Sequence, residues 1–105
     1  MFRAFRTLPY EEKLLSLSSV EQQRIGLLEQ HIKAFPITGK PLGYRFFREK
    51  RINDKRLLFL VYEELGAVLF VAVTNKETQQ RDINYIKASL RQYHDFVLEK
   101  ITKLR

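Results

Sequence analysis

Apolar residues recur along the chain with two distinct periods, which divide it into helical and extended segments. Within residues 9–35 the apolar positions repeat every three or four residues, apart from one serine-rich interruption. Pro9 suits the first turn of a helix, and Ser18 followed by Glu21 has the form of a capping box that starts a second helix. The pattern therefore predicts a helical hairpin that Pro36 brings to an end.

Two continuous apolar runs follow, residues 56–62 and 67–73, and both are rich in β-branched and aromatic side chains. A short connection holds Gly66, so these runs predict a central β-hairpin in which Gly66 takes a positive φ. Residues 44–51 alternate imperfectly and lead into turn residues, which indicates a third antiparallel strand. Residues 2–7 are consistent with one brief edge strand.

After the second run the period becomes helical again, and apolar residues recur from Ile83 to Leu104. This stripe predicts one continuous amphipathic helix. Taken together, the pattern predicts a single α+β domain spanning residues 1–105. It has an N-terminal helical hairpin, a twisted antiparallel sheet of three or four strands, and a C-terminal amphipathic helix.

The composition favours a cytoplasmic location for this domain. The chain has 105 residues, 45% of them hydrophobic, and no cysteine, so neither a disulfide framework nor a thiolate metal site is expected. No segment approaches the run of about 18 apolar residues that a membrane span requires, and the charged N-terminus does not resemble a targeting peptide. We expect no membrane association.

The formal net charge is +7, and most of the excess lies in one stretch. Residues 40–56 contain only two acids, Glu49 and Asp54, against a set of seven cations: Lys40, Arg45, Arg48, Lys50, Arg51, Lys55 and Arg56. Such a stretch attracts phosphate-rich partners, although a solvated hairpin tip would have the same composition. The aromatic residues Tyr44, Phe46 and Phe47 lie among these cations, as in RNA-binding surfaces.

Few residues have the spacing of a catalytic motif. His31 and His94 lie in separate predicted helices, and we expect both to lie outside any active site. No Gly-rich phosphate loop and no metal-ligand spacing is present, so neither metal nor cofactor is expected. Arg56 is the only charge in its apolar run, where a guanidinium can bind a phosphate through two hydrogen bonds. The alternative for Arg56 is an ion pair with Asp54 or Glu49.

The order of these short motifs resembles the RelE/ParE superfamily of type II toxin–antitoxin toxins, and most closely its archaeal-type RelE-like members. The resemblance covers residues 10–90 and rests on the following features: the helical hairpin before Pro36, Gly39-Lys40-Pro41-Leu42, the basic strand, Asp54-Lys55-Arg56, Val61-Tyr62, Val71-Ala72-Val73 and Asn75-Lys76.

The resemblance implies a metal-independent endoribonuclease that cuts mRNA on the ribosome and is inhibited by a small cognate antitoxin. It places catalytic cations on the concave sheet face at Arg45 or Arg48, depending on register, and at Arg56 and Lys76. Family members often have a tyrosine soon after the last strand, and the nearest candidate is Tyr85. The expected RNA-binding residues are Lys40, Tyr44, Lys50, Arg51 and Lys55.

Two alternative functions remain open at this point: inhibition of DNA gyrase, as in ParE-like relatives, and RNA binding without catalysis.

The sequence also suggests where the antitoxin would dock. Both faces of residues 57–61 are apolar, so an acidic amphipathic helix is expected to dock there or against the C-terminal helix.

Overall fold

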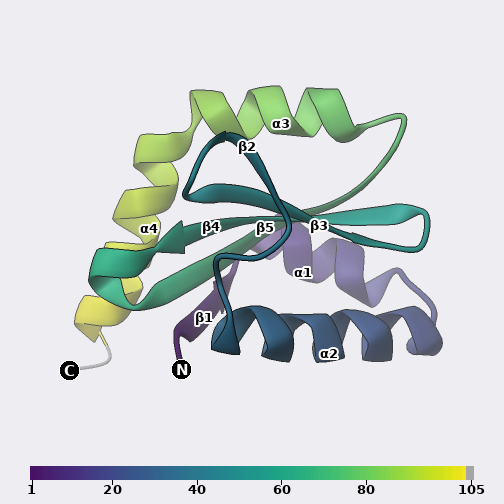
Figure 1. Cartoon of the computed structure of the whole chain (residues 1–105), viewed down its shortest axis with the longest axis horizontal. Helices are drawn as coiled ribbons and strands as arrows, with labels where there is room; N and C mark the ends of the chain where they lie inside the picture. The colour runs from purple at the N-terminus through teal and green to yellow at the C-terminus, as the bar shows by residue number, and fades with distance from the viewer. Residues whose placement is uncertain (104–105) are drawn as a thin grey trace.

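A computed structural model describes residues 1–103 of the chain, and its sheet lies between two layers of helices (Figure 1). The elements, in chain order, are β1 (Arg3–Arg6), α1 (Leu8–Leu15), α2 (Ser19–Ala34), β2 (Lys40–Tyr44), β3 (Phe47–Ile52), β4 (Lys55–Tyr62), the 3₁₀ turn η1 (Glu63–Leu65), β5 (Ala67–Asn75), α3 (Gln79–Ala88) and α4 (Leu90–Lys103). Helices α1 and α2 cover one face of the sheet, and α3 and α4 cover the other.

The sheet has five strands in the order β1-β5-β4-β3-β2 and is mixed rather than purely antiparallel. The brief N-terminal strand is present, but β1 runs parallel to β5. The predicted basic strand is two strands, because the chain turns at Arg45 and Phe46 between β2 and β3. The expectation of an antiparallel sheet of three or four strands is therefore corrected to five mixed strands.

The central β4–β5 hairpin is buried on both faces. Leu57, Phe59 and Val61 pack against α1 and α2, whereas Leu58 and Leu60 pack against α3 and α4. Each of these five side chains is at most 2% exposed. This two-sided coverage is what a strand that is apolar on both faces requires. It also leaves no room for a partner helix on β4, so that part of the expected antitoxin docking site is wrong.

The connection within this hairpin confirms the role predicted for Gly66. The 3₁₀ turn η1 ends at Gly66, whose φ of 60° lies in the left-handed region. A Cβ at this position would meet no atom within 4 Å, so the requirement for glycine is conformational rather than steric.

The start of each N-terminal helix is fixed by a side-chain cap. The Thr7 hydroxyl accepts the backbone N–H of Tyr10, and Ser18 and Glu21 form the predicted capping box. The expected helical hairpin is only partly matched, because α1 packs mainly on β5. α1 and α2 are therefore positioned by packing on the sheet more than by packing on each other.

A buried carboxylate joins β1, α1 and α2. Glu29 is 5% exposed and accepts two hydrogen bonds from Arg6, at 3.0 and 2.6 Å, and one from the Tyr10 hydroxyl at 2.7 Å. A buried charge requires such partners, since an unpaired carboxylate would lose its hydration without compensation. Burial, and secondarily the Glu29 carboxylate, raise the pKa of Tyr10 far above its usual value.

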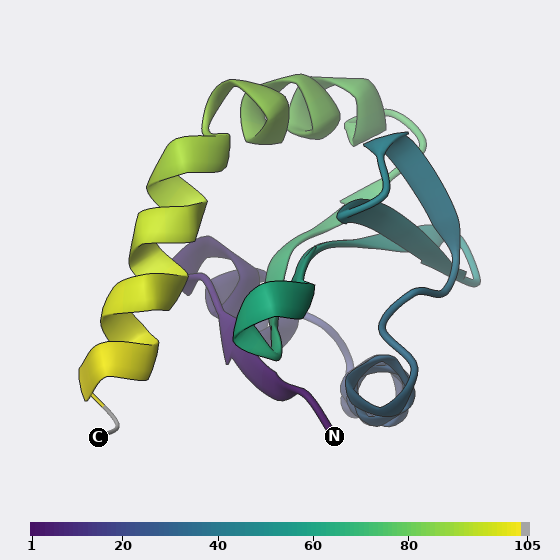
Figure 2. The ribbon, with the colours of Figure 1, turned by 60° about the vertical axis from the view of Figure 1, so that its left-hand side comes forward.

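The C-terminal segment is two helices instead of the one predicted. α3 ends at Ala88, Ser89 caps it, and α4 leaves in a different direction, so that the ribbon bends sharply around the sheet (Figure 2). The apolar stripe is continuous through the bend because Ile83, Ile86 and Val97 all reach the same core. Leu104, the last residue of that predicted stripe, lies outside the described residues. No helix within residues 1–103 has the length and hydrophobicity to cross a membrane.

The Tyr10 hydroxyl predicts an alkaline loss of stability. A raised folded-state pKa favours the neutral phenol, so its contribution is complete below about pH 10 and is lost as the pH rises above that value. Between about pH 10 and pH 11 the parent should lose up to ~1.4 kcal/mol of unfolding free energy more than Tyr10→Phe. Urea unfolding at a series of pH values measures the two slopes, and parallel slopes would contradict the assignment.

Candidate functional site

Arg56 lies at the start of β4, where the strand leaves the β3–β4 turn. It is paired in register with Arg51 of β3 and Thr74 of β5, on the sheet face that α3 and α4 cover. Its side chain is 12% exposed. The guanidinium is therefore held near the surface by a rigid strand, as expected for a cation that meets a specific phosphate.

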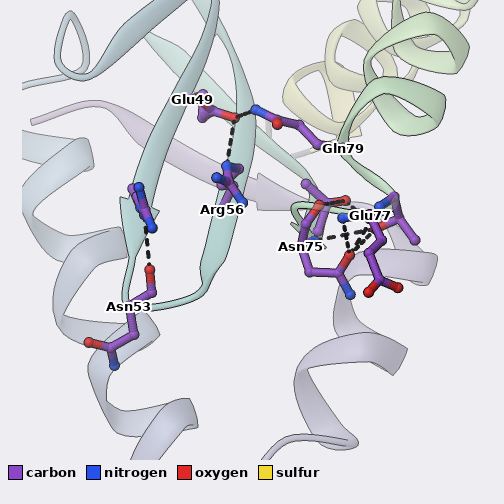
Figure 3. A network of polar contacts seen from close by, with 9 residues as sticks. Glu49, Asn53, Arg56, Asn75, Glu77 and Gln79 are labelled. Atoms are coloured by element: carbon purple, nitrogen blue, oxygen red, sulfur yellow. Dashed lines mark hydrogen bonds and ion pairs between the residues drawn. The ribbon is translucent and has the colours of Figure 1, made fainter.

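Glu49 of β3 is the partner of Arg56. Its Oε1 atom lies 3.8 Å from the Arg56 Nε atom and accepts a short hydrogen bond from the Gln79 side chain at the start of α3. Figure 3 shows the three side chains in a row across two strands and the helix. We call Glu49, Arg56 and Gln79 the Arg56 cluster. The structure thus selects Glu49, rather than Asp54, as the ion-pair partner of Arg56.

Lys40 and Arg51 border this cluster. Lys40 is the register partner of Glu49 and Arg51 is that of Arg56, so both lie on the same face as the cluster. Both are exposed, and the Arg51 Nε atom donates to the Asn53 carbonyl at 3.1 Å. A guanidinium with exposed cations beside it can bind a phosphodiester, and the adjacent buried carboxylate can accept a proton from a hydroxyl group that attacks it.

Lys76 lies in the tight junction between β5 and α3 and is exposed. The Asn75 carboxamide oxygen accepts the backbone N–H groups of Glu77 and Thr78 at 2.9 and 3.0 Å (Figure 3). The hydroxyls of Thr74 and Thr78 lie 2.6 Å apart. These bonds fix the start of α3, and hence Gln79, beside Thr74, the residue that is paired with Arg56.

Arg48 has a different role from the one expected. It is paired with Phe59 and so lies on the α1/α2 face, away from the Arg56 cluster. It is 8% exposed, and its guanidinium donates to the carbonyls of Thr38, Arg45 and Gly39 at 2.8, 2.9 and 3.1 Å. Arg48 therefore holds the loop before β2 in place, and the structure corrects its expected place among the concave-face cations.

Lys50 and Lys55 also lie on the α1/α2 face. The Lys50 ammonium donates to the Thr38 hydroxyl at 3.2 Å. The Lys55 ammonium lies 2.6 Å from a Glu21 carboxylate oxygen, and this contact raises the pKa of Lys55. Lys55 thereby ties the β3–β4 turn to α2. The structure does not bring either lysine to the Arg56 cluster.

The remaining predicted residues lie at other places on the surface. Arg45 is in the β2–β3 turn and pairs with Glu63 at 2.9 Å, and Tyr44 stacks on Phe46. Tyr85 is 67% exposed. The spacing along α3 directs Gln79 toward the sheet with the buried Ile83 and Ile86, and directs Tyr85 outward.

The two histidines lie in opposite layers, His31 on α2 and His94 on α4. Within residues 1–103 no group of three His, Asp or Glu side chains is arranged to hold a metal ion. The sequence named Glu49 only as a possible ion-pair partner of Arg56 and did not single out Gln79. Glu49 lies two residues after the buried Phe47, on the same strand face, which is a signal for its position beside the core.

Comparisons with solved structures find the same fold in RelE proteins. The isolated E. coli RelE toxin matches with a TM-score of 0.66 and 14% sequence identity, over 82% of this chain and 99% of that chain. The RelBE2 toxin–antitoxin complex from Mycobacterium tuberculosis matches with a TM-score of 0.64 and 19% identity, over 71% and 98%. The RelE–RelB complex from Pyrococcus horikoshii gives 0.63 and 14%, over 71% and 94%.

No protein-family model matches the chain, and no curated protein is significantly similar to it in sequence. The structural comparisons alone show that the chain has the α+β fold of RelE toxins. They confirm, at the level of the fold, the resemblance expected from its motifs.

The three carbonyls around Arg48 predict that this residue contributes to stability. Arg48→Met should lower the unfolding free energy by about 2–3 kcal/mol, because the variant leaves partly buried carbonyls without their charged donor. Arg51→Met is the matched control on the same strand and should change it by at most about 0.5 kcal/mol. Thermal or urea unfolding of the two variants measures this difference, and equal stabilities would show that the Arg48 bonds are not structural.

Proposed function

We propose that this chain is the toxin of a type II toxin–antitoxin pair and acts in the cytoplasm as a metal-independent endoribonuclease that cuts mRNA on the ribosome. The observation that carries the proposal is the Arg56 cluster, a fixed guanidinium beside a buried carboxylate on the fold of RelE toxins. The fold supports a toxin role, and the cluster supports phosphodiester chemistry.

The cluster suits cleavage by the neighbouring 2′-hydroxyl of RNA. Glu49 accepts the hydroxyl proton while the 2′-oxygen bonds to phosphorus, and Arg56 stabilises the negative charge that develops on the phosphoryl oxygens. The bond from phosphorus to the 5′-oxygen then breaks, and that oxygen takes a proton from Lys76 or from water. The products are a 2′,3′-cyclic phosphate and a free 5′-hydroxyl.

Gln79 is a positioning residue in this scheme. Its side chain holds the Glu49 carboxylate from the α3 side, whereas Arg56 holds it from β4. The 3.8 Å separation between Glu49 and Arg56 is longer than a direct hydrogen bond, so the guanidinium has donors available for a phosphate. Lys40 and Arg51 attract the RNA, since exposed cations act mainly through long-range steering.

Arg56→Ala and Glu49→Gln should each lower the single-turnover rate of mRNA cleavage at saturating ribosomes by about 10²-fold, as loss of one fixed electrostatic or acid–base contact does. Primer extension on mRNA in a translating extract gives the rate. Arg56→Lys keeps the charge and tests whether the guanidinium geometry is required. Arg24→Ala, an exposed arginine on α2, serves as the unaffected control.

Replacing Lys40 and Arg51 together by Ala should instead weaken association and flatten its salt dependence. A parent-like saturated rate for Arg56→Ala would remove Arg56 from the active site. The alternatives raised by the sequence, gyrase inhibition and RNA binding without cleavage, both predict that the parent makes no ribosome-dependent cut.

A cognate antitoxin is the partner that the toxin role requires. With both faces of β4 covered, the remaining expected docking place is α4, where Leu98 is 43% exposed. An acidic amphipathic helix fits there, because α4 has basic residues in its last turn and the chain carries a net charge of +7.

Co-expression with the product of the neighbouring gene should yield a stable complex on size-exclusion chromatography. Leu98→Glu should weaken this complex by introducing a charge into the apolar contact. Leu27→Glu, a change at a still more exposed leucine on α2, should leave it intact. Separate elution of the two parent proteins would contradict the proposed partnership.

A further inference from the structure

The face that holds the Arg56 cluster has a second feature at the opposite end of β4. A hollow of ≈ 340 Å³ opens there between the β2–β3 turn and the start of α4, and it is lined mainly by Phe46, Tyr62, Leu90, Arg91 and His94. Arg56 and Tyr62 are six residues apart on one strand, which corresponds to about 20 Å at roughly 3.3 Å per residue. The hollow is therefore separate from the cluster.

Aromatic rings line this hollow at Phe46 and Tyr62, and Tyr44 stacks on Phe46 just outside its lining. Tyr44 and Phe46 are stacked, with ring centroids 4.8 Å apart and planes at 29°. Tyr62 meets the His94 ring edge-on at 5.7 Å. The Phe46 carbonyl accepts the Val61 backbone N–H at 2.7 Å, so the turn that carries the stacked pair is fixed to β4. Tyr44 remains 43% exposed and offers a free ring face.

Two cations lie beside these rings. Gly43 has a φ of +87°, and a Cβ there would lie 2.9 Å from the Lys87 ammonium, so glycine leaves room for Lys87 next to Tyr44. Arg91 stands at the rim of the hollow and is exposed. Neither Lys87 nor Arg91 forms an ion pair with another residue in the described part of the chain. The rim has a single acid, Glu64.

We propose that this hollow is a nucleobase subsite for single-stranded RNA. A base lies against the Tyr44–Phe46 pair, and Lys87 and Arg91 bind the phosphates on either side of it. Stacking platforms flanked by cations are the arrangement that binds single strands without reading sequence. An apolar peptide side chain would use the rings but would leave both cations without a partner, so RNA is the better match.

The choice of RNA rests on the proposed function, and the subsite extends it. The Arg56 cluster holds the phosphate to be cut, and the hollow holds a base elsewhere on the same strand, because the two sites share one face of β4. A second anchor at a fixed distance restrains the RNA along the sheet, which places the phosphate at Arg56 more often than one contact does.

The test measures binding by the isolated chain to a fluorescein-labelled hexauridylate, and to the same hexamer without bases, by fluorescence anisotropy. Tyr44→Leu should weaken binding of the hexauridylate about tenfold or more, as loss of one stacked base does. It should leave binding of the abasic hexamer unchanged. Lys87→Met and Arg91→Met should weaken binding of both hexamers and reduce the salt slope by about 0.7 each.

Phe35→Leu, which removes a 64% exposed ring at the end of α2, is the matched aromatic control and should bind both hexamers like the parent. Equal affinity of the parent and Tyr44→Leu for hexauridylate would overturn the subsite and leave the hollow to a protein side chain. Because no ribosome is present, this result is independent of cleavage. Loss of cutting in Arg56→Ala together with unchanged binding in Tyr44→Leu would retain the proposed function and reject only the subsite.

Discussion

The burial of β4 on both faces is the constraint on which the rest of the structure depends. A strand that is apolar on each side needs a helical layer above and another below it, and the chain supplies α1 with α2 and α3 with α4. Residues of the neighbouring strand β3 then alternate between these layers, so its cations are divided between two faces. Arg48 becomes a structural residue on one face, while Arg51 borders the Arg56 cluster on the other.

The position of Arg56 also requires an acid nearby. A guanidinium that is almost covered loses part of its hydration, and a carboxylate on the adjacent strand compensates for that loss. Glu49 provides this carboxylate. Its Oε1 atom faces Arg56 and also accepts a hydrogen bond from the Gln79 side chain, so strand β4 and helix α3 together fix the orientation of the carboxylate. The arrangement that makes the cation stable at this place also puts a carboxylate, a proton acceptor, beside the guanidinium proposed to bind phosphate. Stability and the proposed chemistry therefore depend on the same contacts.

The sequence predicts best those features that local physics determines. The capping box of Ser18 and Glu21, the positive φ of Gly66 and the two central strands follow from short-range rules, and the structure contains all of them. The helix break at Ser89 has no such local signal, because the apolar stripe continues on both sides of it. The faces of Arg48 and Lys50 depend on where β2 ends and β3 begins, and a shift of one residue exchanges the two faces.

The length of β4 sets the distance between the Arg56 cluster and the hollow beside Tyr62, which lie on the same α3/α4 face. Arg56 is the second residue of the strand and Tyr62 the last, and every residue between them is buried, so neither end can move without disturbing both helical layers. The β3–β4 turn is tied to α2 through Lys55, and the β2–β3 turn is tied to β4 through the Phe46 carbonyl. A buried strand thus acts as a rigid spacer. For the proposed RNA substrate, this means that a strand held at one end of β4 would meet the other end at a distance that the core, rather than the surface, determines.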